Sequence, residues 1–200
     1  MRKFNELSYI RKLLASMGVD EIARRMFVTN SFDSMIAIIG IVLGNYIFGI
    51  SNPHSYLGSA LGGSMTMGIF SSFFGVYVTE KAERLRELRE IEEQLLIEIR
   101  NSLYSEVVRF APIYVALWSM FGSILFTFVS LIPFFIAVKG AISIAEAVGS
   151  SVIMLNTMIG FLGAYMGKIS GEGGIAGSLK FLALSLSATA ILSAISLLTP

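Results

Sequence analysis

The chain has 200 residues, of which 54% are hydrophobic and only 14% are charged, with a mean hydropathy of +0.74. Soluble domains carry about 25% charged residues, so this composition excludes an ordinary soluble protein and indicates that lipid surrounds most of the chain. The absence of cysteine excludes disulfides, thiolate metal sites and cysteine nucleophiles, and a single histidine, His54, excludes a histidine-rich zinc site.

Residues 1–27 form a charged N-terminal segment that lacks the short apolar core and the cleavage motif of a signal peptide. Between residues 2 and 17, apolar and basic side chains occupy different faces at helical spacing: Phe4, Leu7, Leu14 and Met17 against Arg2, Lys3, Arg11 and Lys12. This pattern is typical of a helix that lies along a lipid surface. We therefore expect an amphipathic helix on the cytoplasmic face of the membrane.

Five apolar runs follow, at residues 28–50, 56–79, 112–137, 141–167 and 176–198. A hydrocarbon core about 30 Å thick requires roughly 20 apolar residues in a helix, and each run is long enough. The sequence therefore predicts an all-α integral membrane protein with five transmembrane helices. Residues 28–79 hold the first two spans, residues 80–111 a cytoplasmic charged helix, and residues 112–200 the last three spans. We expect Pro112 to start the third helix and Pro133 to bend or end it.

Basic residues predict the orientation of these spans. Six lysines and arginines precede the first span, six lie between the second and third, and two lie between the fourth and fifth, whereas the opposite side receives only Lys139. Cytoplasmic loops carry an excess of lysine and arginine. We therefore expect a cytoplasmic N-terminus and an external C-terminus, in the cell membrane if the organism is prokaryotic.

Asp33 is an acidic residue within the first apolar run. An ionised carboxylate in this setting costs several kcal/mol of desolvation unless a cation compensates it, so such groups usually serve a path for ions or protons. Asn30, one turn earlier, is a candidate to orient Asp33 or to complete its coordination shell. Glu146, near the external end of the fourth span, is either a second acidic station on the same path or a side chain that reaches the outer interface.

Small residues recur at helical spacing in the spans. On the first span, Ala37, Gly40 and Gly44 share a narrow arc with Asp33. The same pattern recurs on the second span at Ser64, Gly68, Ser71 and Gly75, and on the fourth at Ser150, Thr157, Gly160 and Ala164. Small faces let helices approach closely in lipid, so we expect these stripes to face protein.

The charged segment reads as a continuation of the second helix into the cytoplasm, over residues 80–107. Glu80, Glu83, Glu87 and Glu90 fall on one face of this helix. Carboxylates at this spacing can converge on a divalent cation, and two such helices from a dimer could supply a full shell. The alternative is a solvated helix with ion pairs, because Glu80 with Arg84 and Glu83 with Arg86 are also helical ion-pair spacings.

Two segments carry a resemblance to a known family. Between Asn30 and Gly44, the aspartate is followed eleven residues later by a glycine, and Gly75–Thr79 reads Gly-Val-Tyr-Val-Thr. A small-residue run from Gly122 to Pro133 and a glycine-rich region from Gly160 to Gly171 follow in the same order. This set resembles the vacuolar iron transporter family, over roughly residues 24–198. Val76 stands where that family has a glutamate, and Ser72 where it typically has a methionine.

The resemblance implies a five-helix homodimer that exchanges ferrous iron or manganese for protons across the lipid bilayer. It implies that Asp33 lies on the ion path and that cytoplasmic glutamates collect the metal. The candidate metal ligands are thus Asp33, Glu80, Glu83, Glu87, Glu90, Asn30 and Glu146. The metal would be the transported ion rather than a cofactor, and we expect neither a nucleic-acid partner nor an enzyme, because no catalytic pairing or phosphate loop is evident. The alternative is a membrane scaffold or regulator that retains the fold without transport.

Overall fold

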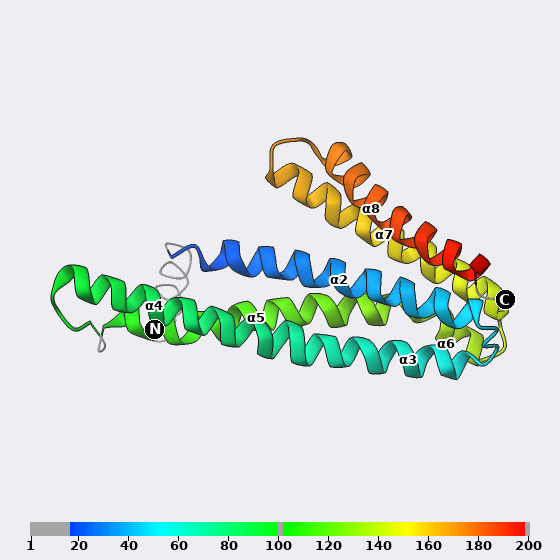
Figure 1. Cartoon of the computed structure of the whole chain (residues 1–200), viewed down its shortest axis with the longest axis horizontal. Coiled ribbons are helices and arrows are strands. Elements are labelled where there is room, and N and C mark those ends of the chain that lie inside the picture. Colours follow the sequence, from blue (N-terminus) through cyan, green and yellow to red (C-terminus); the bar gives the residue numbers. More distant parts are fainter. Residues whose placement is uncertain (1–16, 100–101, 199–200) are drawn as a thin grey trace, which may run out of the picture. The chain divides into compact units, whose positions relative to one another are not determined.

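The computed structural model describes residues 17–99 and 102–198, and all of its regular structure is helical (Figure 1). The elements are α2 (Val19–Ile47), α3 (Pro53–Thr66), the π-helical segment η1 (Met67–Gly75), α4 (Val76–Leu95), α5 (Leu103–Ser130), α6 (Ile132–Val138), α7 (Ile144–Ile169) and α8 (Gly174–Leu198). Apart from Met17, the amphipathic helix expected at residues 2–17 lies outside the described residues.

Five helical stretches of the described chain are long and apolar enough to cross a membrane: Val19–Ile47, Pro53–Leu95, Tyr104–Val138, Ile144–Ile169 and Gly174–Leu192. Each contains most of one predicted span, so the prediction of an all-α membrane protein with five apolar helices is confirmed. The second stretch is 43 residues long. At 1.5 Å per residue it extends about 65 Å, roughly twice the hydrocarbon thickness, because the charged α4 continues the apolar helix.

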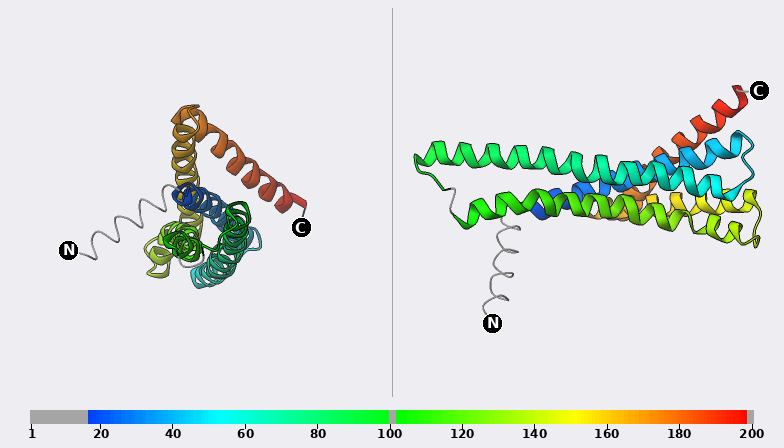
Figure 2. Two further views of the ribbon diagram at one scale, coloured as in Figure 1. Left: turned by 90° about the vertical axis from the view of Figure 1, so that its left-hand side faces the viewer. Right: turned by 90° about the horizontal axis from the view of Figure 1, so that it is seen from below.

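The prediction of one continuous charged helix over residues 80–107 is wrong. Helix α4 ends at Leu95, because Leu96 adopts a left-handed backbone conformation with φ of 54°. The Glu92 carboxylate then accepts the Ile99 backbone N–H at 3.0 Å, which holds the turn. Helix α5 begins at Leu103 and runs back beside α4, so the charged segment is a helical hairpin (Figure 2).

The prolines also differ from expectation. Pro112 lies inside α5, which begins nine residues earlier, so it does not start the third helix. Pro133 occupies the first turn of α6, where its missing N–H costs no helical hydrogen bond. The break between α5 and α6 falls at Leu131. The predicted bend near Pro133 is therefore confirmed, with the proline starting the second piece rather than ending the first.

The chain forms two compact units, and the helices α2 and α5 each contribute to both. Unit 1 comprises the described residues up to Asn30 together with Gly68–Gly122. Its buried core is built from Val19 and Ala23 of α2 with Ala111 and Val115 of α5, and partly buried side chains, Val76 among them, pack against this cluster. The start of α2 is thereby held against the α4–α5 hairpin.

Unit 2 comprises Ser31–Met67 and the residues from Ser123 onward. Helices α7 and α8 form its hairpin, shown in yellow to red in Figure 1. A Cβ at Gly163 would lie 2.6 Å from the Gly177 carbonyl oxygen and 2.7 Å from Phe181 Cβ. The two helices are this close because neither backbone carries a side chain at the crossing.

The remainder of unit 2 is joined by ring stacking and hydroxyl groups. The Tyr56 ring of α3 stacks on the Phe134 ring of α6, with centroids 4.8 Å apart. The Ser151 hydroxyl of α7 donates to the Ser130 carbonyl at 2.8 Å, and the Ser185 hydroxyl of α8 donates to the Asn156 side chain at 2.9 Å.

The glycine crossing gives a direct stability prediction. Gly163→Ala should lower the free energy of unfolding by about 1–3 kcal/mol, because the added methyl group meets backbone atoms that cannot move aside singly. The control is Gly149→Ala on the same helix, where an added Cβ meets nothing within 4 Å. Thermal unfolding of both variants in detergent, followed by circular dichroism, measures the difference. Equal unfolding temperatures would contradict the close-packed crossing.

Candidate functional site

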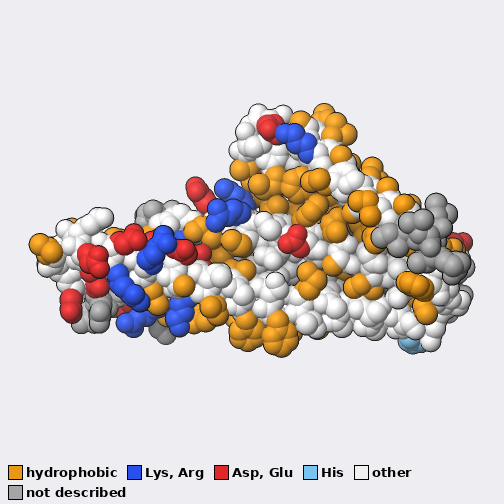
Figure 3. Space-filling view, in the orientation of Figure 1, with side chains coloured by type: hydrophobic (Ala, Val, Ile, Leu, Met, Phe, Trp, Pro, Cys, Tyr) orange, Lys and Arg blue, Asp and Glu red, His pale blue; other side chains and the backbone are white. Residues whose placement is uncertain are grey.

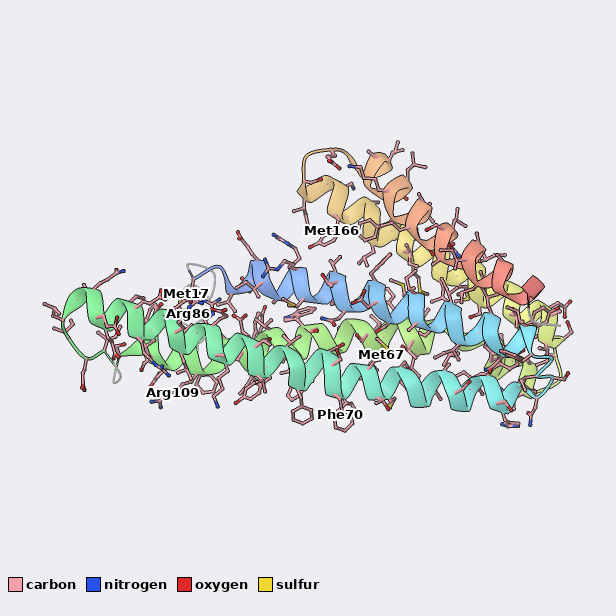
Figure 4. The ribbon with its side chains drawn as sticks, viewed as in Figure 1. Met17, Met67, Phe70, Arg86, Arg109 and Met166 are labelled. Carbon is pink, nitrogen blue, oxygen red and sulfur yellow. The ribbon has the colours of Figure 1, made fainter. Side chains whose placement is uncertain are left out.

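The second apolar helix contains nine consecutive π-helical residues, the segment η1. A π turn holds more residues than an α turn, so it changes which side chains face inward, and such segments are frequent at functional sites. Ser72 is 2% exposed, whereas Phe70 is 66% exposed and points away from the helices (Figure 4). The expectation that Ser71 and Gly75 face protein is wrong for the single chain, because both are exposed and Ser72 faces inward instead.

Asn30 is the centre of a polar cluster within unit 1. Its Nδ2 donates to Ser119 Oγ of α5 at 2.7 Å and to the Met26 carbonyl at 3.1 Å. Its Oδ1 accepts from the Ser72 hydroxyl of η1 at 3.3 Å. The amide therefore connects three apolar helices through side chains that are distant in sequence. Ser119 is fully buried, so water does not compete for these bonds.

Asp33 follows Asn30 by one helical turn and lies at the middle residue of the 29-residue helix α2. Its side chain is exposed on the single chain. Among the residues that the structure describes, none donates a hydrogen bond to its carboxylate or forms an ion pair with it. Gly44, on the same arc of α2, has open space where a Cβ would be. A single chain thus leaves Asp33 exposed and the space beside Gly44 open, whereas a Cβ at Gly40, between them on the same arc, would lie 3.8 Å from Leu192 of α8.

The four glutamates of α4 that the sequence suggested as metal ligands are engaged in ion pairs. Arg84 lies between Glu80 and Glu87, with a nitrogen-to-oxygen distance of 2.9 Å to each. Arg86 pairs with Glu83 at 3.2 Å and with Glu90 at 3.3 Å. Within the described part of the chain, no three histidine, aspartate or glutamate side chains are grouped closely enough to hold a metal ion. Among the residues described for the single chain, these glutamates therefore form the ion pairs that their spacing to Arg84 and Arg86 also predicted, and they do not form a metal site.

Arg84 differs from Arg86 in its burial. The Arg84 side chain is 5% exposed and that of Arg86 is 66% exposed. Arg84 Nη1 also lies 3.5 Å from the Met17 carbonyl, so this arginine joins α4 to the chain entering α2. Its Nη2 has no hydrogen-bond partner among the described atoms. Figure 4 shows Met17 and Arg86 near this junction.

Glu146 has a local structural role. Helix α7 begins at Ile144, so Glu146 lies in its first turn rather than some six residues inside the span. Its Oε2 accepts the Ser143 backbone N–H at 2.7 Å, while the Ser143 hydroxyl accepts the Glu146 N–H at 3.3 Å. This capping box satisfies two backbone donors at the start of α7. The sequence left two alternatives for Glu146, a second acidic station on the ion path or a side chain at the outer interface. Its exposed carboxylate at the start of the helix fits the second.

Two members of the polar cluster, Ser72 and Ser119, were not among the predicted site residues. Ser72 was noted only as the residue that stands where vacuolar iron transporters typically have a methionine. Ser119 has a spacing signal, because Ser119, Ser123 and Thr127 recur every four residues on α5. This spacing indicates one polar stripe on an otherwise apolar helix. All three are buried in the structure.

Comparison with known proteins finds a distant relative and no matching family model. No family model matches the chain, and no solved structure matches it. The chain is 27% identical over 177 residues to the uncharacterized protein MJ0645 of Methanocaldococcus jannaschii, and this match covers 86% of the chain and 87% of the relative. The similarity extends over most of both proteins and assigns no activity.

Removal of the central amide should destabilise unit 1. Asn30→Ala leaves two buried hydroxyl groups without this partner, and we expect a loss of about 1–2 kcal/mol of unfolding free energy. Thr29→Ala, at the exposed neighbouring position, should change it by less than about 0.5 kcal/mol. Denaturant titration in detergent micelles measures both values, and equal losses would show that the cluster contributes nothing.

Arg84 and Arg86, two of the three arginines of α4, should respond differently to neutralisation. Arg84→Gln leaves Glu80 and Glu87 without their buried counter-charge, at a cost of about 3–5 kcal/mol. Arg86→Gln breaks only exposed pairs, which contribute about 0–1 kcal/mol. Thermal unfolding of the two variants checks this order. A larger effect at Arg86 would contradict the burial described for Arg84.

Proposed function

We propose that this protein is a homodimeric transporter for a divalent transition metal, ferrous iron or manganese, coupled to proton movement. The observation that carries the proposal is Asp33, a carboxylate at the middle of the first apolar helix and exposed on the single chain. The resemblance to vacuolar iron transporters supports the choice of ion.

The position of Asp33 supports an ion path for an energetic reason. A charged side chain deep in a membrane is costly by several kcal/mol, so it persists where water, a cation or a protein partner compensates it. Aspartate oxygens suit manganese and other divalent first-row ions. Protonation of the carboxylate weakens its coordination of the metal, so proton entry releases the ion.

A second copy of the chain would complete the site. One carboxylate cannot fill the coordination shell of a divalent ion, and the described residues of one chain hold no group of three acidic or histidine ligands. The open face at Gly44, on the same arc as Asp33, supports close approach of another helix there. Dimer symmetry would then bring two Asp33 carboxylates to one path.

The α4 glutamates would collect the metal before it enters. Glu83 and Glu90 pair with the exposed Arg86, and exposed pairs contribute little, so a divalent cation can displace this arginine at small cost. Glu80 and Glu87 are held by the buried Arg84 and are harder to release. In this proposal, the hairpin and the N-terminus are cytoplasmic, in agreement with the excess of basic residues in both segments.

A non-transporting scaffold or regulator is the second candidate. It is supported by Val76, which stands in place of the family glutamate and packs against the apolar core of unit 1. No ligand atom is available from this side chain. Ion pairing of the four candidate glutamates Glu80, Glu83, Glu87 and Glu90 is consistent with the same alternative.

Metal flux distinguishes the two candidates. Purified protein in proteoliposomes should carry ferrous iron or manganese with an accompanying change in internal pH, and Asp33→Ala should reduce this flux at least tenfold. Glu172→Ala removes an exposed acid of the α7–α8 turn and should retain normal flux. A metal-sensitive dye and a pH-sensitive dye inside the vesicles report both quantities. Equal leak from wild type and Asp33→Ala would favour the scaffold.

A further inference from the structure

A partly open cavity of about 250 Å³ lies between α4 and α5, its two arginines are exposed, and the proposed transport does not use it. All of its lining residues belong to unit 1. Three of them are apolar: Leu85, Leu88 and Val108. The other four are polar: Arg89, Glu92, Ser105 and Arg109. The cavity thus combines a hydrocarbon lining with two guanidinium groups.

The two arginines of the cavity form no ion pair with any acid that the structure describes. Within the described residues, neither Arg89 nor Arg109 forms an ion pair, whereas Arg84 and Arg86 on the same helix α4 are each paired with two glutamates. Two positive charges that line one small cavity repel each other. An anion bound between them removes that repulsion and can accept several charge-assisted hydrogen bonds.

The remaining polar groups do not neutralise the arginines. Glu92 is the only acid of the cavity lining, and its carboxylate accepts the Ile99 N–H at the turn between α4 and α5. Ser105 is buried and its hydroxyl donates to the Ser102 carbonyl at 2.9 Å, and a hydroxyl carries no charge that could neutralise an arginine. The net charge of the lining residues is +1, from two arginines and one glutamate.

The cavity lies at the edge of the apolar surface. Arg109 directly precedes Phe110, which is 62% exposed, and Ile113, Leu117 and Phe121 continue the exposed apolar side of α5. Figure 3 shows basic side chains gathered over the hairpin next to apolar surface, and Figure 4 shows Arg109 on the outside of the hairpin. An exposed apolar helix surface contacts lipid, so we infer that Arg109, at the end of this surface, lies at the level of the lipid headgroups.

We propose that this cavity binds a phosphoryl group, with Arg89 and Arg109 as its ligands, and that the group belongs to an anionic phospholipid. The planar guanidinium group of an arginine can donate two parallel hydrogen bonds to two oxygens of one phosphate. The apolar lining formed by Leu85, Leu88 and Val108 accommodates the glycerol and the first acyl carbons. Free phosphate carries the same negative charge as the lipid headgroup, but it has no hydrocarbon to contact the apolar lining. Lipid bound here fixes the hairpin at the membrane surface.

The test measures binding of three probes to the full-length protein in detergent: dioctanoylphosphatidylglycerol, dioctanoylphosphatidylcholine and sodium phosphate. The anionic lipid should bind more tightly than the zwitterionic one. The double variant Arg89→Gln/Arg109→Gln should weaken its binding about 30-fold, from the loss of two interfacial charges. The matched control Arg86→Gln removes one charge from the same helix outside the cavity and should change binding less than twofold.

A second double variant, Arg89→Lys/Arg109→Lys, keeps the charge and should bind more weakly than wild type but more tightly than the glutamine variant. Size-exclusion profiles and circular dichroism show whether each variant is folded. Arginine-dependent binding of the lipid without competition by sodium phosphate identifies the lipid as the source, and competition at micromolar phosphate identifies free phosphate. Equal binding of the two lipids, or an equal loss in the Arg86 control, overturns the proposed site.

Discussion

The scarcity of water inside a membrane is the constraint on which this structure depends, because every polar group placed there needs a partner from the protein. The Asn30 amide meets this need by bonding Ser72 of η1 and Ser119 of α5, and it thereby joins three helices. Hydroxyl groups do the same in unit 2, where Ser151 bonds the Ser130 carbonyl. Apolar side chains alone specify little here, since lipid tails solvate them as well as other helices do.

Charge is distributed according to the same constraint. Among the residues that the structure describes, most of the ionic groups lie on the α4–α5 hairpin, which can hold a buried arginine, Arg84, because two glutamates surround it. Asp33 is the exception, since it stands at the middle of α2 without an ionic partner among the described residues. The proposed function follows from this contrast: a group that the single chain leaves uncompensated is the one that a transported cation or a second copy would compensate.

Local patterns predicted the helices but not the contacts between them. Apolar runs of about 20 residues are a local property, so the order of the five spans followed directly from the sequence. The turn at Leu96 was missed because leucine rarely adopts a left-handed backbone, and charged residues continue on both sides of it. The side-chain partners of Asn30 lie 42 and 89 residues away in the sequence. Ser72 faces inward because it lies in a π-helical segment, and no pattern of residues predicts such a segment.

The central claim is that position 33 is reached by water and by a divalent cation, and thiol labelling tests it most directly. The chain contains no cysteine, so Ala37→Cys, one helical turn after Asp33 on the same arc of α2, provides a single reactive thiol and leaves the Asp33 carboxylate in place. The account predicts that a water-soluble maleimide labels this thiol in proteoliposomes and that manganese slows the labelling severalfold. Ile153→Cys, at an exposed apolar position of α7, should react only with a lipid-soluble maleimide. Reaction of the thiol at position 37 with the lipid-soluble reagent alone, or labelling that manganese does not change, would contradict the account.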